Sequence, residues 1–289
     1  MYSAVLSVLL MGMVPVLGST LPELVPLADL SIASPSPFVP GSAQVPTLGK
    51  RVSASGVLVL DLQSSQQLYG RNADMRRPLA SLTKLMTALL IAENHSMDEV
   101  VTVPKTINKV EGSKAPLVPG ERYTVGDLLS AMLMVSANDA AEALALYHSG
   151  TEAAFVAAMN ARAQELGLHD TSFANPIGLD DPAQWSTPRD IAWLALFDYR
   201  NAAIRSRMSM KQTVIRDADG GLLPLLHTHE LLRQDPAVLA GKTGTTGDAR
   251  ECLLSVVREG GREYMVVLLG SRERYIDMRS LLRTLALLA

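Results

Sequence analysis

The chain has 289 residues, of which 48% are hydrophobic and 19% charged, and its formal net charge is −3. Acidic and basic residues are interspersed along it, which excludes the concentrated basic surface typical of nucleic-acid-binding proteins. Cys252 is the single cysteine, so no disulfide can form within the chain, and its apolar surroundings indicate a buried, inert thiol.

The N-terminal part of the sequence is typical of a leader followed by a linker. Residues 1–20 contain no charged side chain, and an apolar run extends from residue 4 to residue 17. Such a run is short for a membrane span and suits the core of a signal peptide, although the usual basic residues before it are missing. We predict a signal peptide over residues 1–18, a Pro- and Ser-rich linker over 19–52 and one folded domain over 53–289.

The folded part begins with two predicted strands, over residues 56–62 and 67–69. Residues 80–93 then predict a helix, because leucine and methionine recur there at spacings of three and four. Ser81 and Lys84 lie three positions apart near its start, so the Lys84 amine can reach the Ser81 hydroxyl. An apolar environment would lower the pKa of that amine and make it a usable base for a serine nucleophile. A capping serine followed by a solvated lysine fits the same residues.

Ser136 and Asn138 separate two apolar helical patterns, one over residues 125–135 and one that starts at residue 139. Because the two polar residues are two positions apart in a predicted break between helices, their hydroxyl and amide groups can face one pocket. Serine and asparagine also commonly cap a following helix. The pair by itself therefore fits either a binding loop or a helix start.

Lys242, Thr243 and Gly244 precede two strand-like apolar runs, over residues 252–257 and 263–270. This pattern predicts a hairpin, with the three residues on the edge of the strand before it. A lysine and a threonine there offer a positive charge and a hydroxyl to a substrate carboxylate, and a glycine lets another backbone approach closely. A basic edge that discourages aggregation explains the lysine alone.

The order of these elements predicts an α/β fold of the α+β type. Strands from both ends of the domain join one antiparallel sheet, which is flanked by the helix that carries Ser81 and by a final helix over residues 278–288. A helical lobe carries Ser136 and Asn138. The candidate site then lies between the edge of the sheet and this lobe.

The three motifs occur in the order found in the low-molecular-mass penicillin-binding proteins. Further segments similar to that family extend the likeness over about residues 53–284, among them FANPIGL at 173–179 and STPRD at 186–190. The chain thus resembles the D-alanyl-D-alanine carboxypeptidases and endopeptidases, which are serine peptidases with a β-lactamase/DD-peptidase-like fold. The resemblance implies that residues 53–289 form a transpeptidase-like DD-peptidase catalytic domain.

The resemblance also implies catalytic roles for five residues. Ser81 would be the acylated nucleophile, and Lys84 would be its general base. Ser136 would relay the proton to the leaving amine, while Asn138 would hold the substrate amide and help to position the base. Lys242 would support this relay electrostatically.

Substrate contacts are implied on and beside the same strand. Thr243 would contact the substrate carboxylate next to Gly244, and the backbone N–H groups of Ser81 and Thr245 would form the oxyanion hole. Arg274 matches an arginine that some family members use near the terminal carboxylate of the substrate. An arginine before a predicted helix also fits a solvated surface position.

The implied function is that of a serine-type D-Ala-D-Ala carboxypeptidase that acts on peptidoglycan stem peptides through an acyl-enzyme and is trapped by penicillin. An endopeptidase for D-Ala–meso-diaminopimelate cross-links and a non-catalytic penicillin- or peptidoglycan-binding module remain open. A β-lactamase is disfavoured, because residues 175–190 contain no glutamate to activate a deacylating water. Asp180 and Asp181 in that segment are interpreted as turn residues.

We expect no cofactor and no metal site, because the histidine pair His227 and His229 lacks a third ligand nearby. The expected partners are stem peptides that end in D-Ala-D-Ala, their cross-links, and β-lactams as inhibitors, with no nucleic acid and no stable transmembrane anchor. The sequence stops at Ala289, before the second β-rich domain and amphipathic tail of many family members. We therefore predict an exported protein that is periplasmic or extracellular.

Overall fold

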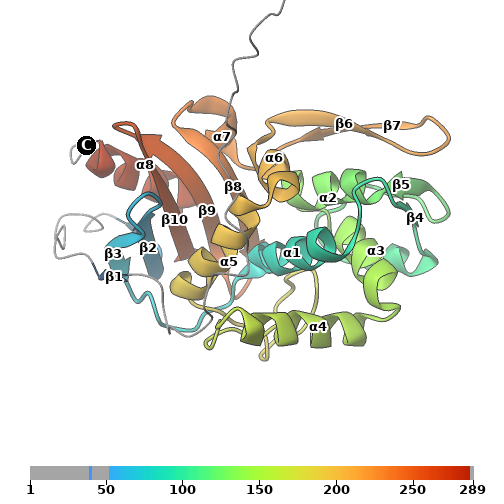
Figure 1. The fold of residues 1–289 in the computed structure, drawn as a ribbon, viewed down its shortest axis with the longest axis horizontal. Coiled ribbons are helices and arrows are strands. Elements are labelled where there is room, and N and C mark those ends of the chain that lie inside the picture. The colour runs from blue at the N-terminus through green and yellow to red at the C-terminus, as the bar shows by residue number, and fades with distance from the viewer. Residues whose placement is uncertain (1–38, 41–51, 287–289) are drawn as a thin grey trace, which may run out of the picture. The chain divides into compact units, whose positions relative to one another are not determined.

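The computed structural model describes residues 39–40 and 52–286 (Figure 1). The signal peptide predicted over residues 1–18 lies outside these ranges, and so does most of the linker predicted over 19–52. Within the described part of the chain, no helix has the length and apolar character needed to cross a membrane.

A six-stranded sheet contains strands from both ends of the described chain, in the order β1-β3-β2-β10-β9-β8. Its strands are β1 (Val39–Pro40), β2 (Gly56–Asp61), β3 (Gln66–Arg71), β8 (Val238–Thr246), β9 (Arg250–Glu259) and β10 (Arg262–Ser271). All neighbouring strands pair antiparallel except β1, which runs parallel to β3. The predicted antiparallel sheet is thus confirmed, and β8 lies at one edge of it.

The sheet is covered on both faces, because successive side chains of a strand point to opposite sides. Along β2, Leu58 and Leu60 lie in one hydrophobic cluster, and Val57 and Val59 lie in the other. The second cluster is closed by α8 (Arg274–Leu285), which packs along β9 and β10 (Figure 1). Burial on both faces explains why the central strands are apolar throughout rather than alternating.

The first cluster joins the sheet to the helical lobe. The helices of this part are α1 (Lys84–Asn94), α2 (Val125–Met134), α3 (Asn138–Ser149), α4 (Glu152–Glu165), α5 (Pro188–Arg200) and α6 (Ala202–Ser209). All five others contact α1, and its residues 84–91 are buried without exception. The nucleophile helix is therefore the centre of the lobe, and its lysine has no route to bulk solvent along the helix surface.

Smaller elements complete the chain. They are the 3₁₀ turns η2 (Ala80–Thr83) and η3 (Lys105–Lys109), the strand pair β4 (Val100–Thr102) and β5 (Arg122–Thr124), the hairpin β6 (Gln212–Arg216) and β7 (Leu222–Leu226), and the short helix α7 (Glu230–Gln234). The hairpin contacts α2 and extends along the helical lobe (Figure 1).

Threonine caps fix where three of these helices start. The hydroxyl groups of Thr124, Thr151 and Thr187 accept hydrogen bonds from backbone N–H groups in the first turns of α2, α4 and α5. Pro188 follows the last of them at the first helical position, where a residue without an N–H group is well tolerated. Such caps typically stabilise a helix by about 1 kcal/mol each.

Two predicted helices differ from the observed ones at their starts. The helix predicted over residues 80–93 opens with a 3₁₀ turn, and its α-helical part starts only at Lys84. Ala80 has a φ of 48°, and this left-handed conformation cannot belong to a right-handed α-helix. The final helix, predicted over 278–288, starts earlier, at Arg274.

Asp198 of α5 is fully buried, and neither carboxylate oxygen has a hydrogen-bond partner among the described residues. Burial, and secondarily the charge of Glu93, raises its pKa well above the usual value. In the unfolded chain this carboxyl ionises near pH 4, whereas the folded protein keeps it protonated. Stability is therefore fully present below that pH and falls as the pH rises toward the raised pKa.

We expect Asp198→Asn to weaken this pH dependence. In urea unfolding at pH 5 and pH 8, the loss of unfolding free energy between the two pH values should be smaller than in the wild type by about 1 kcal/mol or more. Asp98→Asn, at an exposed position, is the matched control and should leave the difference unchanged. An identical slope in the wild type and in Asp198→Asn would contradict the assignment of a buried neutral acid.

Candidate active site

Ser81 and Lys84 meet where the 3₁₀ turn η2 passes into α1. The Lys84 Nζ atom lies 3.0 Å from the Ser81 Oγ atom, so the reach predicted from their spacing is present. Ser81 is partly exposed, whereas Lys84 is fully buried. The serine therefore faces an accessible region while its partner amine is withdrawn from water.

Two further oxygen atoms surround the Lys84 amine. Its Nζ atom lies 2.6 Å from Asn138 Oδ1 and also forms a short hydrogen bond to the Ile177 carbonyl. A neutral amine can donate two hydrogen bonds to these acceptors and turn its lone pair toward the Ser81 hydroxyl. This arrangement suits the form of the lysine that accepts a proton.

Burial is the main reason that the neutral form of Lys84 is favoured. It lowers the pKa of the amine well below the usual lysine value, and the positive charge of Lys242 adds to the effect, while the negative charge of Asp139 opposes it. Desolvation disfavours a charged ammonium unless it is compensated by a partner charge. The Asp139 carboxylate is itself occupied, because it accepts hydrogen bonds from the N–H groups of Ala115 and Leu117.

Asn138 is the first residue of α3, and its amide is fixed from both ends. Its Oδ1 atom accepts from the lysine, and its Nδ2 atom donates to the Glu111 carbonyl at 2.6 Å. A Cβ atom on Gly112 would lie 2.7 Å from that nitrogen, so the backbone of this loop packs directly against the amide. No motif or periodicity in the sequence predicts that residues 111–113 lie against Asn138.

Ser136 precedes the same helix in an unusual backbone conformation. Its φ of 59° lies in the left-handed region, which is unfavourable for a serine and is often found at functional sites. Its Oγ atom accepts a hydrogen bond from Lys242 Nζ at 2.8 Å. Ser136 and Asn138 thus face two different lysines, and the helix-capping alternative for Asn138 is excluded because it has entered α3.

Lys242 is the second fully buried lysine of the site. Besides Ser136, it donates to the Thr243 carbonyl at 2.8 Å. Burial, followed by the positive charge of Arg274, lowers its pKa to about 7. The site therefore holds two serine–lysine pairs, and the charge of Lys242 acts on the Lys84 amine.

Gly244 brings β8 against the turn that carries Ser81. A Cβ atom at this position would lie 2.9 Å from the Ser81 backbone nitrogen and 3.0 Å from Ala80 Cβ, distances that packed atoms do not tolerate. The close approach predicted for this glycine is thus observed. Gly178 makes a similar contact from the other side, since a Cβ there would lie 2.2 Å from the Ala80 carbonyl oxygen.

The remaining predicted residues lie along or behind the same strand. Thr243 is buried, and its hydroxyl is 2.7 Å from the Thr228 hydroxyl, while Thr245 is exposed. The alternative interpretation of Arg274, as a solvated surface residue before a helix, is wrong. Its Nη1 atom donates to the Gly244 carbonyl at 2.8 Å, and its side chain is only 16% exposed.

The two histidines close to the lysine strand are structural. His229 bonds to the Ser255 hydroxyl and caps α7 through Nδ1, and His227 Nδ1 accepts from the backbone N–H group of His229. Burial lowers the pKa of each histidine to about 3, so both are neutral. Within residues 39–40 and 52–286, no group of three or more potential ligand side chains could hold a metal ion.

A family model described as D-alanyl-D-alanine carboxypeptidase matches residues 42–273. The chain belongs to this family. The match covers most of the sequence, and it confirms the resemblance drawn from the three motifs.

Individual relatives carry two different names. D-alanyl-D-alanine carboxypeptidase DacF of Bacillus subtilis is 33% identical over 233 residues, which cover 77% of this chain and 60% of the relative. The D-alanyl-D-alanine endopeptidase of Pseudomonas aeruginosa is 34% identical over 232 residues, covering 78% and 74%. The chain thus spans less than two thirds of the Bacillus protein's length.

Solved structures confirm the predicted α+β fold. The D-alanyl-D-alanine carboxypeptidase of Mycobacterium tuberculosis H37Rv superposes with a TM-score of 0.79 at 28% identity, covering 87% of this chain and 96% of the other. The Streptomyces K15 DD-transpeptidase superposes with a TM-score of 0.75 at 28% identity, covering 80% and 96%. Solved structures with two reaction names, carboxypeptidase and transpeptidase, therefore share this fold.

Gly244→Ala should impair the site without unfolding the protein, because the added methyl group forces β8 away from the Ser81 turn. We expect the rate of acylation by a fluorescent penicillin to fall by about 100-fold, as a 1 Å misplacement of reacting groups can produce. Gly247→Ala is the matched control three residues further on, where a Cβ meets only Asp180 Oδ2 at 3.7 Å. Equal rates in both variants would contradict the steric role of Gly244.

Proposed function

We propose that this chain is a serine-type D-Ala-D-Ala carboxypeptidase that acts on peptidoglycan stem peptides through an acyl-enzyme on Ser81. One observation carries the proposal: a fully buried Lys84 amine, with its pKa lowered, lies 3.0 Å from the Ser81 hydroxyl oxygen. A serine hydroxyl needs such a base to attack a peptide carbonyl. Membership of the family supplies the substrate class.

Acylation begins when Lys84 takes the Ser81 proton and the serine oxygen attacks the carbonyl carbon of the penultimate D-Ala. The negative charge that develops on the carbonyl oxygen is stabilised by the backbone N–H groups of Ser81 and Thr245. Ser136 then relays this proton from the Lys84 ammonium to the leaving amine, so that Lys84 becomes neutral again, and Lys242 holds the Ser136 hydroxyl in place for this transfer. The C–N bond breaks, the terminal D-Ala leaves, and the remaining peptide is bound to the serine as an ester.

Deacylation repeats the same steps with water. The neutral Lys84 amine accepts a proton from a water molecule, which attacks the ester carbonyl while the same N–H groups hold the oxyanion. The Ser81 oxygen leaves and recovers a proton, and the shortened peptide is released. Asn138 maintains the position of the amine throughout, because its own amide is held by the Glu111 carbonyl.

The substrate carboxylate is recognised by Thr243 with the positive charge of Lys242 behind it. Arg274 contributes from behind the strand, since it donates a hydrogen bond to the Gly244 carbonyl and lowers the pKa of Lys242. Its role in this proposal is to position the strand and to tune the neighbouring lysine. Gly244 takes part by allowing the strand to lie against the nucleophile turn.

Cleavage of cross-links is the second candidate function, because a relative of similar identity is named an endopeptidase. The two reactions share every catalytic step and differ only in the group that is attached beyond the scissile D-Ala amide.

A β-lactamase is less well supported. Asp180 lies in the loop where a deacylating acid would be sought, but it binds the Thr246 hydroxyl at 2.5 Å and the Asp248 N–H group at 3.1 Å, so it serves as a tether between loops.

The substrate implies where the enzyme works. Peptidoglycan lies outside the cytoplasmic membrane, so a carboxypeptidase that acts on it has to be exported. The signal peptide predicted over residues 1–18 would provide that export. We therefore propose a periplasmic or extracellular location, with stem peptides as substrates and β-lactams as covalent inhibitors.

Incubation with penicillin followed by intact-mass spectrometry tests the acyl-enzyme. We expect the wild type to gain the mass of one penicilloyl group within minutes and to keep it for hours, because residues 175–190 contain no glutamate of the kind that activates water for rapid release in β-lactamases. Ser81→Ala should gain nothing and should also fail to release D-Ala from a D-Ala-D-Ala peptide. Rapid loss of the adduct with consumption of penicillin would indicate a β-lactamase, and an unmodified wild type would exclude the proposed nucleophile.

The two buried lysines predict a bell-shaped pH profile of acylation. The rate should rise with pH as Lys84 becomes neutral, and it should fall again as Lys242, with its pKa of about 7, loses its charge. Arg274→Gln removes a neighbouring positive charge, which raises the pKa of Lys242 and moves the falling limb to higher pH. A falling limb that stays in place in this variant would contradict the assignment.

A further inference from the structure

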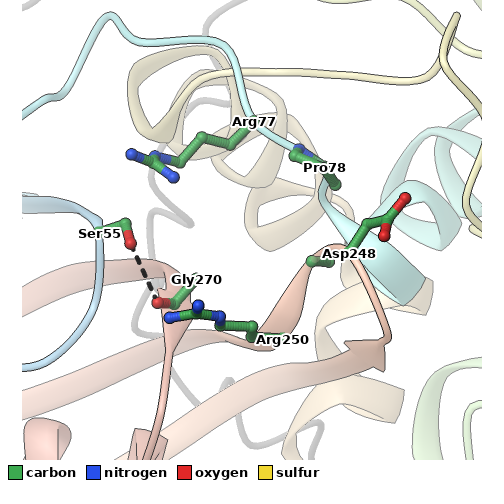
Figure 2. Close-up of a pocket in the computed structure, with 7 residues that line it drawn as sticks. Ser55, Arg77, Pro78, Asp248, Arg250 and Gly270 are labelled. Carbon is green, nitrogen blue, oxygen red and sulfur yellow. Dashed lines mark hydrogen bonds between the residues drawn. The ribbon is translucent and has the colours of Figure 1, made fainter.

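A pocket of about 210 Å³ lies beside the segment that leads into Ser81. Ser55, Arg250 and Gly270 line it from the ends of the sheet strands, and Arg77 and Pro78 line it from the opposite side (Figure 2). The guanidinium group of Arg77 reaches over the strand end, with Nη1 lying 3.8 Å from the point where a Cβ on Gly270 would be. The reaction proposed above uses none of these side chains.

Two arginines of this pocket lack a counter-charge within the described part of the chain. Arg77 Nη2 contacts only the Met75 sulfur, at 3.4 Å, and its Nε atom is buried without a hydrogen-bond partner. Arg250 is exposed, and neither arginine forms an ion pair with a described residue. The single carboxylate of the lining, that of Asp248, points away from both guanidinium groups (Figure 2).

Other arginines of the described chain have a carboxylate partner. Arg262 pairs with Asp61 at 2.5 Å, and Arg189 pairs with Asp74 at the same distance. A partly desolvated cation without such a partner is unfavourable, and a bound anion would relieve it. An anion from outside the chain would give Arg77 the charged partner that it lacks, and would satisfy its buried Nε atom.

The backbone of Arg250 gives an independent indication. Its φ of 56° lies in the left-handed region, at the residue that follows the three-residue turn between β8 and β9. Hairpin turns of this length usually place glycine or asparagine in the left-handed position, because those residues adopt it with little strain. An arginine in this conformation is strained, and strained backbone of this kind is often found at functional sites.

We propose that this pocket binds a small oxyanion, a carboxylate or a phosphate, between the guanidinium groups of Arg77 and Arg250. The planar fork of a guanidinium group donates two parallel hydrogen bonds to either kind of anion. The Ser55 hydroxyl, which holds the Gly270 carbonyl only through a 3.3 Å hydrogen bond, provides a further donor. The site is separate from the serine–lysine pairs, so it stands whether or not the proposed peptidase reaction is correct.

Isothermal titration calorimetry at low ionic strength tests the proposal with two probes, N-acetylglycine as the carboxylate and inorganic phosphate. We expect saturable binding of at least one probe with one site per chain. Arg77→Gln and Arg250→Gln should each weaken that binding by about 10- to 100-fold, the usual contribution of a charge-assisted hydrogen bond. Tighter binding of N-acetylglycine identifies a peptide carboxylate as the ligand, and tighter binding of phosphate identifies a phosphorylated one.

Two controls separate this pocket from other basic positions. Arg200→Gln, at an exposed arginine at the end of α5, should leave the affinity unchanged, and so should Arg233→Gln, at an exposed arginine in the last turn of α7. Arg77 also has a structural role, because its backbone bonds to that of Ser186. If Arg77→Gln does not fold, the exposed Arg250→Gln alone tests whether the anion binds in this pocket. Absence of saturable binding, or binding that Arg250→Gln leaves intact, overturns the proposal.

Discussion

The buried Lys84 amine is the interaction on which the rest of the site depends. Its three oxygen neighbours, on Ser81, Asn138 and Ile177, come from the nucleophile turn, from the start of α3 and from the loop before α5. An ammonium ion held there would be desolvated, whereas a neutral amine satisfies the same atoms at little cost. Burial therefore has two effects: it fixes the position of the Lys84 amine, and it keeps that amine neutral and able to accept a proton. A change in the packing of the helical lobe around Lys84 would alter both the position and the pKa of the amine.

Burial is the main cause of the lowered pKa of both site lysines, and neighbouring charges add to it. Arg274 lowers the pKa of Lys242 further, and Lys242 further lowers that of Lys84, while the Asp139 carboxylate opposes the last effect. Such coupling allows two lysines of identical chemistry to hold different protonation states, one as a proton acceptor and the other as a fixed charge.

The sheet contributes rigidity and close approach. Its central strands are buried on both faces, so β8 is held by packing against β9 and by the helices on either side. Gly244 on this strand and Gly178 in the facing loop both lack room for a side chain, because the backbone around Ala80 and Ser81 fills the space. The nucleophile turn is clamped between them. This packing is consistent with the left-handed conformation of Ala80.

The sequence by itself determined the family, the antiparallel sheet with its helical lobe, and the pairing of Ser81 with Lys84. Hydrophobic periodicity and short spacings depend on residues that are close in the sequence, so they can be recognised without knowing the tertiary structure. It predicted the helices to within a few residues, but not the 3₁₀ turn, which arises from the packing around Ala80. The family resemblance already implied that Asn138 helps to position the lysine. Only the tertiary structure decided that the Ile177 carbonyl holds it as well, and that Arg274 lies inward against β8. Those contacts join segments far apart in the chain, and long-range packing leaves no periodic signal in the residues that make it.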